Sequence, residues 1–145
     1  DIHELLMILW GKVVCDTVDS IIDGTADAIP QEQMEVEGEL RPAPKIFKDT
    51  CRIDFSRTAE QIYNHVRGLS PYPAAWIGED TPTHPLAEML RGAKVYKVAK
   101  IHVAEQKGHI IFPCADGYVD ILELQLPGKK RMQASALLNG LKNKS

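Results

Sequence analysis

The chain has 145 residues, three cysteines and a formal net charge of −3 at pH 7. Its longest run of large apolar side chains, residues 5–10, is far shorter than the ~20 residues that cross a membrane, and residues 1–4 lack the basic start of a signal peptide. We therefore expect a cytoplasmic protein that has no membrane partner. The length suits one domain with an extension, and the Asp at position 1 indicates a piece of a longer protein.

Charge is distributed unevenly along the chain. Residues 1–40 contain ten acidic side chains and one basic side chain, Lys12, which gives this segment a net charge of −9. The remaining residues contain 16 Lys and Arg against ten Asp and Glu, a net charge of +6. A basic domain behind an acidic segment favours a polyanionic partner for the second part alone.

The cysteines and histidines do not suggest a metal site. Cys15, Cys51 and Cys114 are odd in number, widely spaced and without a Cys-x-x-Cys pair, and none of the five histidines stands at metal-ligand spacing from them. We expect free, buried thiols in a reducing compartment and no bound metal. His84 lies in a predicted loop, where a single histidine is expected at the surface.

Residues 1–24 are predicted to form one long amphipathic helix, over residues 2–23. Asp1 and Glu4 have the spacing of a capping box, and Gly24 can end the helix in a left-handed conformation. The stripe of apolar side chains on this helix must be buried against another surface. Residues 25–45 contain three prolines and several Glu, and are predicted to be an extended linker. The stripe recurs at mostly helical spacing and consists of Ile2, Leu5, Leu6, Leu9, Val13, Val18, Ile21 and Ile22.

Residues 46–145 are predicted to form a separate domain. Thr58 and Gln61 have the capping-box spacing for a second helix, which prolines 71 and 73 must end. Residues 94–104 then alternate between apolar and polar side chains, as in a strand, and further strands are predicted at 109–114 and 118–126 with a hairpin turn at Asp116–Gly117. A short helix is predicted at 135–141. The expected core consists of Ile53, Phe55, Ile62, Val66, Trp76, Val98, Ile101, Ile121 and Leu124.

These elements define the expected fold class. It is α+β and mostly β: a small antiparallel barrel with an associated helix, preceded by the long helix and the linker.

Three short segments carry a resemblance to a known family. Residues 52–56 (RIDFS), 70–76 (SPYPAAW) and 124–132 (LQLPGKKRM) resemble the Arg-Ile-Asp-Trp, Asn-Pro-Trp-Pro-Gly-Ala-Trp and Leu-Gln-Pro-Ala-Gly-Lys-Lys-Met segments of the C-terminal part of methionyl-tRNA formyltransferase. Phe55 and Tyr72 stand where the family usually has Trp, and Ala74 where it has Gly. The resemblance covers roughly residues 41–142, and residues 1–31 resemble the last helix of the family's catalytic domain.

The resemblance implies a fold and a function. The C-terminal domain of the family is like an OB-fold and binds tRNA, and the whole enzyme transfers a formyl group from 10-formyltetrahydrofolate to the amino group of Met on initiator tRNA. The family's catalytic residues belong to motifs such as His-x-Ser-Leu-Leu-Pro, which this sequence does not contain. We therefore assign no catalytic, cofactor-binding or metal-binding residue, and expect this chain to be inactive by itself. The implied partners are initiator methionyl-tRNA and the catalytic domain.

Basic side chains are the candidate tRNA-binding residues. Lys129, Lys130 and Arg131 follow a predicted Pro127–Gly128 turn, and we add Lys94 and Lys100 from the strand at 94–104. Lys94, Lys97 and Lys100 are spaced by three, so regular alternation would divide them between the two faces of a strand. Residues 52–56 are expected to supply core side chains and a local ion pair, and Trp76 to fill the barrel.

Other interpretations stay open from the sequence. The chain could come from another folate-dependent formyltransferase or hydrolase, or be a generic oligonucleotide-binding OB-like module. Residues 78–93 resemble an inserted loop with a helical turn, and 104–108 are shorter than the family's usual connection. The apolar stripe of residues 2–22 could fold back onto the barrel or pair two chains in a homodimer, of which we favour the homodimer.

Overall fold

The computed structural model describes residues 2–35, 38–40 and 42–142. The chain divides into two compact units, residues 1–43 and residues 44–145. The division lies inside the predicted linker, where the structure has a short 3₁₀ helix, η1 (Gln31–Gln33). The assignment of residues 1–24, 25–45 and 46–145 to three functional parts remains a prediction.

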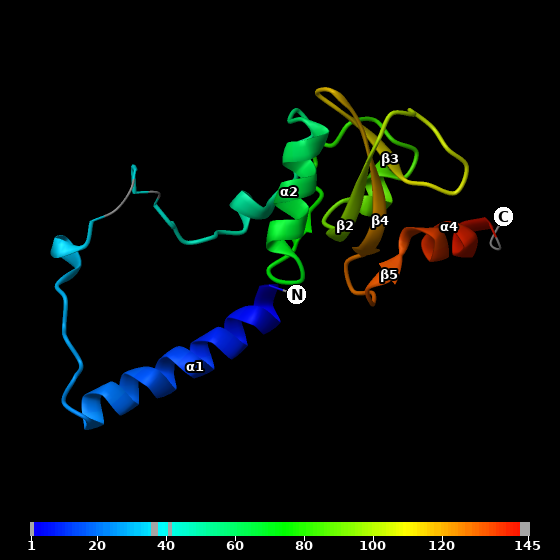
Figure 1. Cartoon of the computed structure of the whole chain (residues 1–145). Helices are drawn as coiled ribbons and strands as arrows, with labels where there is room; N and C mark the ends of the chain where they lie inside the picture. The colour runs from blue at the N-terminus through cyan, green and yellow to red at the C-terminus, as the bar shows by residue number, and fades with distance from the viewer. Residues whose placement is uncertain (1, 36–37, 41, 143–145) are drawn as a thin grey trace. The chain divides into compact units, whose positions relative to one another are not determined.

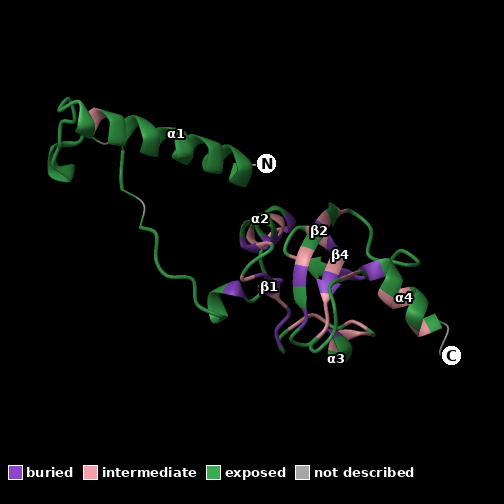
Figure 2. Ribbon diagram, turned by 90° about the horizontal axis from the view of Figure 1, so that it is seen from below, coloured by how far each residue is buried: buried purple, intermediate pink, exposed green. Residues whose placement is uncertain are grey.

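The first unit is built on one long helix, α1 (Ile2–Ile22) (Figure 1). Gly24 follows it at φ +70°, and Thr25 and Ala26 donate hydrogen bonds to the carbonyl of Ser20, which satisfies the C-terminal end. The predicted cap at Asp1 lies outside the described residues. No described side chain of α1 is buried (Figure 2). Among the described residues, no helix is long and apolar enough to cross a membrane.

The apolar surface of α1 is broader than the predicted stripe. Leu6 and Leu9 of the stripe are 44% and 53% exposed, and Met7, Trp10 and Val14 outside it are more exposed still. Because residues 5–10 are consecutive, they cover more than a full turn of the helix. Helices with apolar side chains all round are normally enclosed by protein.

The second unit begins with a 3₁₀ helix, η2 (Asp49–Cys51), followed by the helix α2 (Ala59–Leu69). The predicted capping box of α2 is confirmed: Thr58 Oγ1 accepts a hydrogen bond from the Gln61 amide, and Gln61 Oε1 accepts one from the Thr58 amide. Asp116 also accepts a 2.7 Å hydrogen bond from the Ala59 amide. The start of α2 is therefore fixed both by its own sequence and by a turn 57 residues further on.

An antiparallel sheet forms the centre of the second unit. Its strands are β1 (Ala75–Trp76), β2 (Lys94–Ile101), β3 (Ile111–Cys114), β4 (Gly117–Gln125) and β5 (Met132–Gln133), in the order β1-β2-β4-β3 with β5 also paired to β4. Helix α2 packs on β2 and β4, and α4 (Ala134–Lys142) packs on β4 and β5. The predicted α+β class and antiparallel sheet are confirmed. The sheet is open in the described part of the chain, with β1 and β3 as its edges.

The core lies between the sheet and α2. Seven of the nine predicted core residues are buried, and the most enclosed side chains include Phe112, Ile62 and Ile121. Trp76 and Ile101 were predicted in the core but are half-buried. Trp76 lies at the margin because its indole Nε1 donates a 2.8 Å hydrogen bond to the Lys48 carbonyl, and a ring filling the barrel would leave that donor unpaired.

Several predicted elements differ in detail from the structure. Residues 52–56 form no full strand: Arg52 makes one isolated parallel bridge with Trp76, while Ile53 and Phe55 are buried as expected. The local ion pair of this segment joins Asp54 to Arg57, because Arg52 instead reaches Asp80.

The predicted hairpin is present, but its two loop residues are Ala115 and Asp116, since Gly117 pairs with Cys114 in the ladder. Strand β2 ends at Ile101, three residues earlier than expected. The inserted segment 78–93 contains the expected helical turn, α3 (Ala87–Leu90).

The thiols are free, but only Cys51 is buried; Cys114 is half-buried and Cys15 is exposed, so the prediction of buried thiols is wrong for Cys15. Burial raises the pKa of the Cys114 thiol. Ala74 has φ +72°, in the left-handed region that favours glycine, at the position where the resembling family has Gly. Its amide donates to the Leu69 carbonyl, so the turn after α2 keeps this conformation.

Candidate nucleic-acid interface

The basic segment 127–131 forms the loop between β4 and β5. Its backbone turns at Gly128, φ +70°, and the Lys129 amide donates a 3.0 Å hydrogen bond to the Leu126 carbonyl. The Gln125 side chain donates a 2.8 Å hydrogen bond to the Lys129 carbonyl and accepts a 2.7 Å hydrogen bond from the Tyr96 hydroxyl. The loop is therefore held to the end of β4 before any ligand binds.

Arg131 differs from its two lysine neighbours. Its guanidinium donates to both carboxylate oxygens of Glu123, at 2.6 and 2.9 Å, and lies 4.2 Å from the centre of the Tyr96 ring. The hydrogen bonds from Arg131 lower the pKa of Glu123, and the same contact raises the pKa of Arg131. Part of the Arg131 charge is thus neutralised within the protein. Lys129 and Lys130 are exposed and have no ion-pair partner among the described residues.

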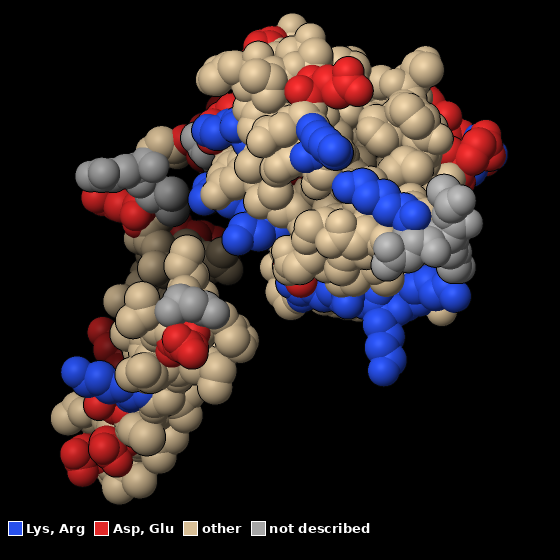
Figure 3. Space-filling view, turned by 90° about the vertical axis from the view of Figure 1, so that its right-hand side faces the viewer, with Lys and Arg blue, Asp and Glu red and all other residues tan. Residues whose placement is uncertain are grey.

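The structure brings Lys94 to the same place. Lys94 is the register partner of Gln125 in the β2–β4 ladder, and Gln125 holds the Lys129 carbonyl. Figure 3 shows Lys and Arg side chains gathered along the lower edge of the larger unit. Four of the five predicted site residues, Lys94, Lys129, Lys130 and Arg131, therefore adjoin one loop.

Lys100 lies apart from this group. It is six residues further along β2, roughly 20 Å at strand rise. Its ammonium pairs with Glu60 of α2 and lies 5.4 Å from the centre of the Tyr63 ring. The hydrogen bond from Lys100 lowers the pKa of Glu60. Lys100 thus has a structural role in joining β2 to α2.

The three lysines of β2 are exposed and alternate with buried valines. Lys94, Lys97 and Lys100 are all exposed, while Val95 and Val98 are buried. Register shifts on either side of Lys97 break the alternation of β2, so positions three apart can share an environment.

Sequence reasoning missed two lysines near the loop. Lys45 Nζ lies 5.6 Å from the centre of the Phe47 ring, and Lys48 Nζ lies 5.5 Å from that of Trp76. Their signal was present as KIFK at 45–48, where two lysines flank Ile46 and Phe47 directly before η2. Trp76 is the β1 register partner of Lys94, which connects these residues to the predicted site.

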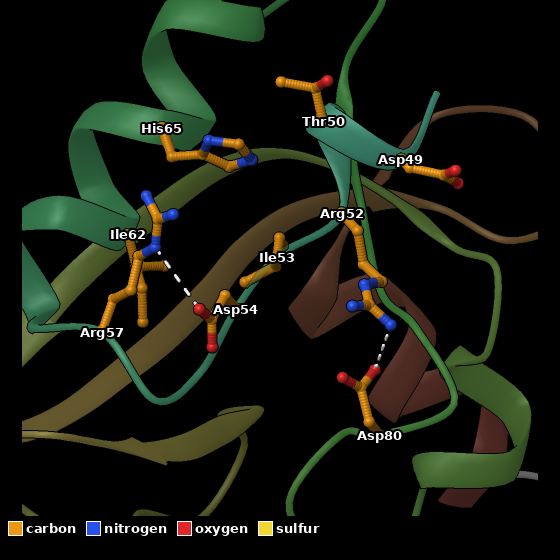
Figure 4. A pocket seen from close by; sticks show the side chains of 9 residues that line it. All are labelled: Asp49, Thr50, Arg52, Ile53, Asp54, Arg57, Ile62, His65 and Asp80. Atoms are coloured by element: carbon orange, nitrogen blue, oxygen red, sulfur yellow. Dashed lines mark hydrogen bonds and ion pairs between the residues drawn. The ribbon is translucent and has the colours of Figure 1, made fainter. Parts of the chain in front are cut away.

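A polar pocket of about 500 Å³, apart from the loop at 127–131, lies between residues 49–57 and α2 (Figure 4). Its two arginines are each paired: Arg52 with Asp80 at 3.1 Å and Arg57 with Asp54 at 3.4 Å. Hydrogen bonds from Ser56 lower the pKa of Asp54. His65 Nε2 is buried and has no hydrogen-bond partner among the described residues. The paired charges leave little net field for an anionic ligand.

Two other histidines serve the packing. His84 was expected at the surface but is half-buried: its Nδ1 accepts a hydrogen bond from the Leu86 amide, and its ring lies 4.8 Å from that of Phe112. Burial lowers its pKa. His109 Nδ1 lies 2.6 Å from Asp120 Oδ2, and Asp120, which is buried, also accepts from the Ile110 amide at 3.3 Å. These contacts satisfy a buried carboxylate.

Comparison with known proteins places this arrangement in a family. The model of the formyl transferase C-terminal domain matches residues 45–142, which is most of the second unit. The chain belongs to the formyl transferase family.

Curated relatives extend the similarity over nearly the whole chain. The chain is 45% identical to "Methionyl-tRNA formyltransferase" of Bacteroides fragilis and 46% identical to that of Bacteroides thetaiotaomicron, over 96% and 97% of its length. The corresponding protein of Porphyromonas gingivalis is 38% identical over 97% of the chain. The chain spans 45–46% of the length of these relatives. The predicted resemblance to the C-terminal part of methionyl-tRNA formyltransferase is confirmed.

Solved structures share the fold at low sequence identity. HypX from Aquifex aeolicus matches with a TM-score of 0.60 and 13% identity, over 91% of this chain and 23% of that one. A second HypX structure, in complex with tetrahydrofolic acid, matches with a TM-score of 0.57 and 12% identity, over 88% of this chain and 22% of that one. At this identity the likeness concerns the fold alone.

Proposed function

We propose that the chain is the tRNA-binding part of a methionyl-tRNA formyltransferase, which formylates the amino group of Met on initiator tRNA with 10-formyltetrahydrofolate. The proposal is supported most directly by the geometry of the loop at 127–131. Its backbone is fixed by Gln125, its lysines are exposed, and Lys94 lies beside it. Phosphate groups bind such charges and contribute affinity without sequence information.

In this proposal the chain binds tRNA, and the rest of a longer protein carries out catalysis. Residues 46–145 hold the tRNA, residues 25–45 act as a linker, and residues 1–24 belong to the catalytic part, which supplies folate binding and formyl transfer. The chain alone is therefore expected to transfer no formyl group to Met-tRNA. Its role in translation initiation implies the cytoplasm.

The second candidate function is formyl transfer to another substrate, such as a sugar nucleotide. A sugar nucleotide carries only one or two phosphates, whereas the loop at 127–131 and strand β2 together present several lysines. The names of the curated relatives also favour tRNA over that candidate.

The apolar surface of α1 is part of the same proposal. In the longer protein it would be covered by the catalytic domain. In this chain alone, we propose that two copies of residues 2–22 pair in a symmetric dimer, because two identical apolar surfaces can bury each other.

The tRNA proposal is tested by measuring the affinity for initiator tRNA at several salt concentrations. Replacing both Lys129 and Lys130 with Ala should weaken binding and reduce the slope of log K against log salt by up to about 2. Arg131 is left intact because its loss would also break the Glu123 pair and the Tyr96 contact.

The matched control is a double Ala variant of Lys107 and Lys142. Both lysines are exposed and lie outside the loop, and replacing them removes the same charge. This control should lower the slope much less. Equal effects of the two double variants would remove the loop from the site, and a chain that does not bind tRNA at low salt would refute the proposed function.

A further inference from the structure

An open groove of about 540 Å³ lies next to the basic loop, between residues 46–48 and the turn at 72–74. Phe47, Tyr72 and Trp76 line it together with Lys48 and Lys94. Its volume is typical of sites that hold a small ligand or one part of a larger one.

The aromatic rings of the groove are more exposed than the fold requires. Tyr72 is 85% exposed and Phe47 is 61% exposed, and Ile46 beside Phe47 is also exposed. Trp76, between them, is half-buried. The packing of the domain therefore does not depend on the Tyr72 and Phe47 rings, and clustered apolar side chains of this kind mark interaction sites.

The charged side chains that line the groove or lie over its rings are all positive. Lys48 lies over the Trp76 ring and Lys45 over the Phe47 ring. Lys94 stands directly opposite Trp76 in the β1–β2 ladder. Among the described residues that line the groove, none is acidic. The groove therefore combines flat apolar surfaces with cations at its rim.

The walls of the groove are held in place by the fold. Trp76 Nε1 donates to the Lys48 carbonyl at 2.8 Å, and Cys51 Sγ donates to the Phe47 carbonyl at 3.3 Å. Residues 47 and 48 are thereby fixed to β1 and to the buried end of η2. The backbone of residues 47 and 48 and the Trp76 ring are therefore in place before a ligand binds, which reduces the entropy lost on binding.

We infer that this groove binds unpaired nucleotides of an RNA, with bases stacked on Tyr72 and Phe47 and phosphates held by Lys45, Lys48 and Lys94. The inference rests on the proposed RNA-binding function and adds a second type of contact to it. Bases within a duplex are already stacked on each other and are not available to a ring, whereas unpaired bases stack on aromatic side chains regardless of sequence.

The groove and the basic loop form one surface that makes two kinds of contact with RNA. Lys94 borders both, because it faces Trp76 on β1 and Gln125 on β4. In this arrangement the loop contacts the phosphates of a helical stem, and the groove takes the single-stranded nucleotides next to it. The positive charge of the rim argues against an apolar protein segment as the occupant, since that segment would bring no counter-charge.

The test compares a single-stranded RNA carrying 2-aminopurine with the same strand in a blunt duplex, using the full chain. Binding of the single strand should quench the 2-aminopurine signal. Replacing Tyr72 with Ala should lower single-strand affinity by about five- to tenfold, the loss expected for one stacked base, with little change in duplex affinity. Tyr72→Trp should preserve binding and quenching because it keeps a stacking surface.

Two controls separate stacking from other effects. Val103→Ala removes an exposed apolar side chain outside the groove and should leave both affinities unchanged. The double Ala variant of Lys129 and Lys130 should weaken single-strand and duplex binding alike. Because Tyr72 is 85% exposed, its Ala variant is expected to fold, which an unchanged melting temperature would verify.

The outcomes distinguish a failure of the groove from a failure of the proposed RNA binding. A Tyr72→Ala variant that loses single-strand and duplex affinity equally, or neither, would refute the groove while leaving the proposed RNA binding in place. A Tyr72→Ala variant that changes only the oligomeric state would show that the groove is a protein interface, and the inference would be wrong. Absence of binding to either RNA would refute the proposed function and the groove together.

Discussion

Burial of apolar side chains differs sharply between residues 2–35 and residues 44–142. In the second region Phe112, Ile77 and Leu124 are completely buried, and one core joins α2 to the sheet. In the first region α1 has no buried side chain in the described part, and Leu5, Ile8 and Trp10 are each at least 67% exposed. The two regions also differ in charge, since residues 1–40 are acidic and the remainder is basic.

The two regions therefore differ in whether their own residues can bury their apolar side chains. The second region buries one core of apolar side chains among its own strands and helices. The first region presents a helical surface that its own residues leave exposed, and burying it requires the rest of a longer protein, a second copy or residues 44–142. An exposed apolar surface of this extent is a binding surface rather than a stable boundary with water.

The largest expected effect concerns α1. We expect the purified chain to be dimeric at micromolar concentration, and a double Leu6→Asp, Leu9→Asp variant to be monomeric. Each leucine contributes roughly 1.5–3 kcal/mol when fully buried, so the two charges should raise the dimer dissociation constant by at least about a hundredfold. Light scattering of the two proteins measures the mass directly.

A control keeps this result specific to the apolar surface. Lys12→Asp reverses the charge at an exposed polar position of the same helix and should leave the dimer intact. A wild-type chain that is monomeric throughout, and as stable as its Leu6→Asp, Leu9→Asp variant, would contradict the dimer.

The second expected effect concerns the core of residues 44–142. Phe112 is fully buried and lies 4.9 Å from the Phe55 ring and 4.8 Å from the His84 ring. Phe112→Ala should lower the free energy of unfolding of this domain by about 3–5 kcal/mol, through lost burial and the cavity left behind. Denaturant unfolding followed by near-ultraviolet circular dichroism would measure it.

Tyr72→Ala is the matched control for Phe112→Ala, because it removes an aromatic ring that is 85% exposed. It should change the free energy of unfolding by less than about 0.5 kcal/mol. Similar losses for the two variants would show that the domain core does not lie where the structure places it.

Local signals in the sequence predicted the elements, and long-range contacts decided their details. The capping box of Thr58 and Gln61 needs only residues three apart, and it was predicted correctly. The partner of Arg52 is Asp80, 28 residues further on, and no local pattern distinguishes that carboxylate from Asp54. The marginal position of Trp76 likewise follows from a carbonyl 28 residues earlier.

The candidate site depended on strand register in the same way. Lys129, Lys130 and Arg131 were adjacent in sequence and could be proposed together. Lys94 adjoins them, whereas Lys100 does not. This difference results from the pairing of Lys94 with Gln125, together with register shifts around Lys97. A bulge sets two residues of one strand against one of its partner, and an alternation pattern does not encode where this happens.

The smallest expected effect concerns the ion pair that stabilises the basic loop. Glu123 accepts two hydrogen bonds from Arg131, and its pKa lies below the ordinary value of 4.5 because of them. A lowered pKa means that the pair stabilises the fold above the ordinary pKa of glutamate, and that this contribution disappears as the pH falls through the folded-state value. Glu123→Gln should therefore cost up to about 1 kcal/mol at pH 7 and progressively less below pH 4.5.

Glu88→Gln provides the comparison for this pH dependence. Glu88 also pairs with an arginine, Arg91, at 3.0 Å, but its side chain is 87% exposed, whereas that of Glu123 is 19% exposed. Solvent screening should make the loss at Glu88 negligible at every pH. Unfolding of the three proteins in denaturant between neutral and acidic pH would measure both differences. A loss at Glu123 that persists in acid would mean that the carboxylate charge is not the source, and that packing against Arg131 and Tyr96 fixes the loop instead.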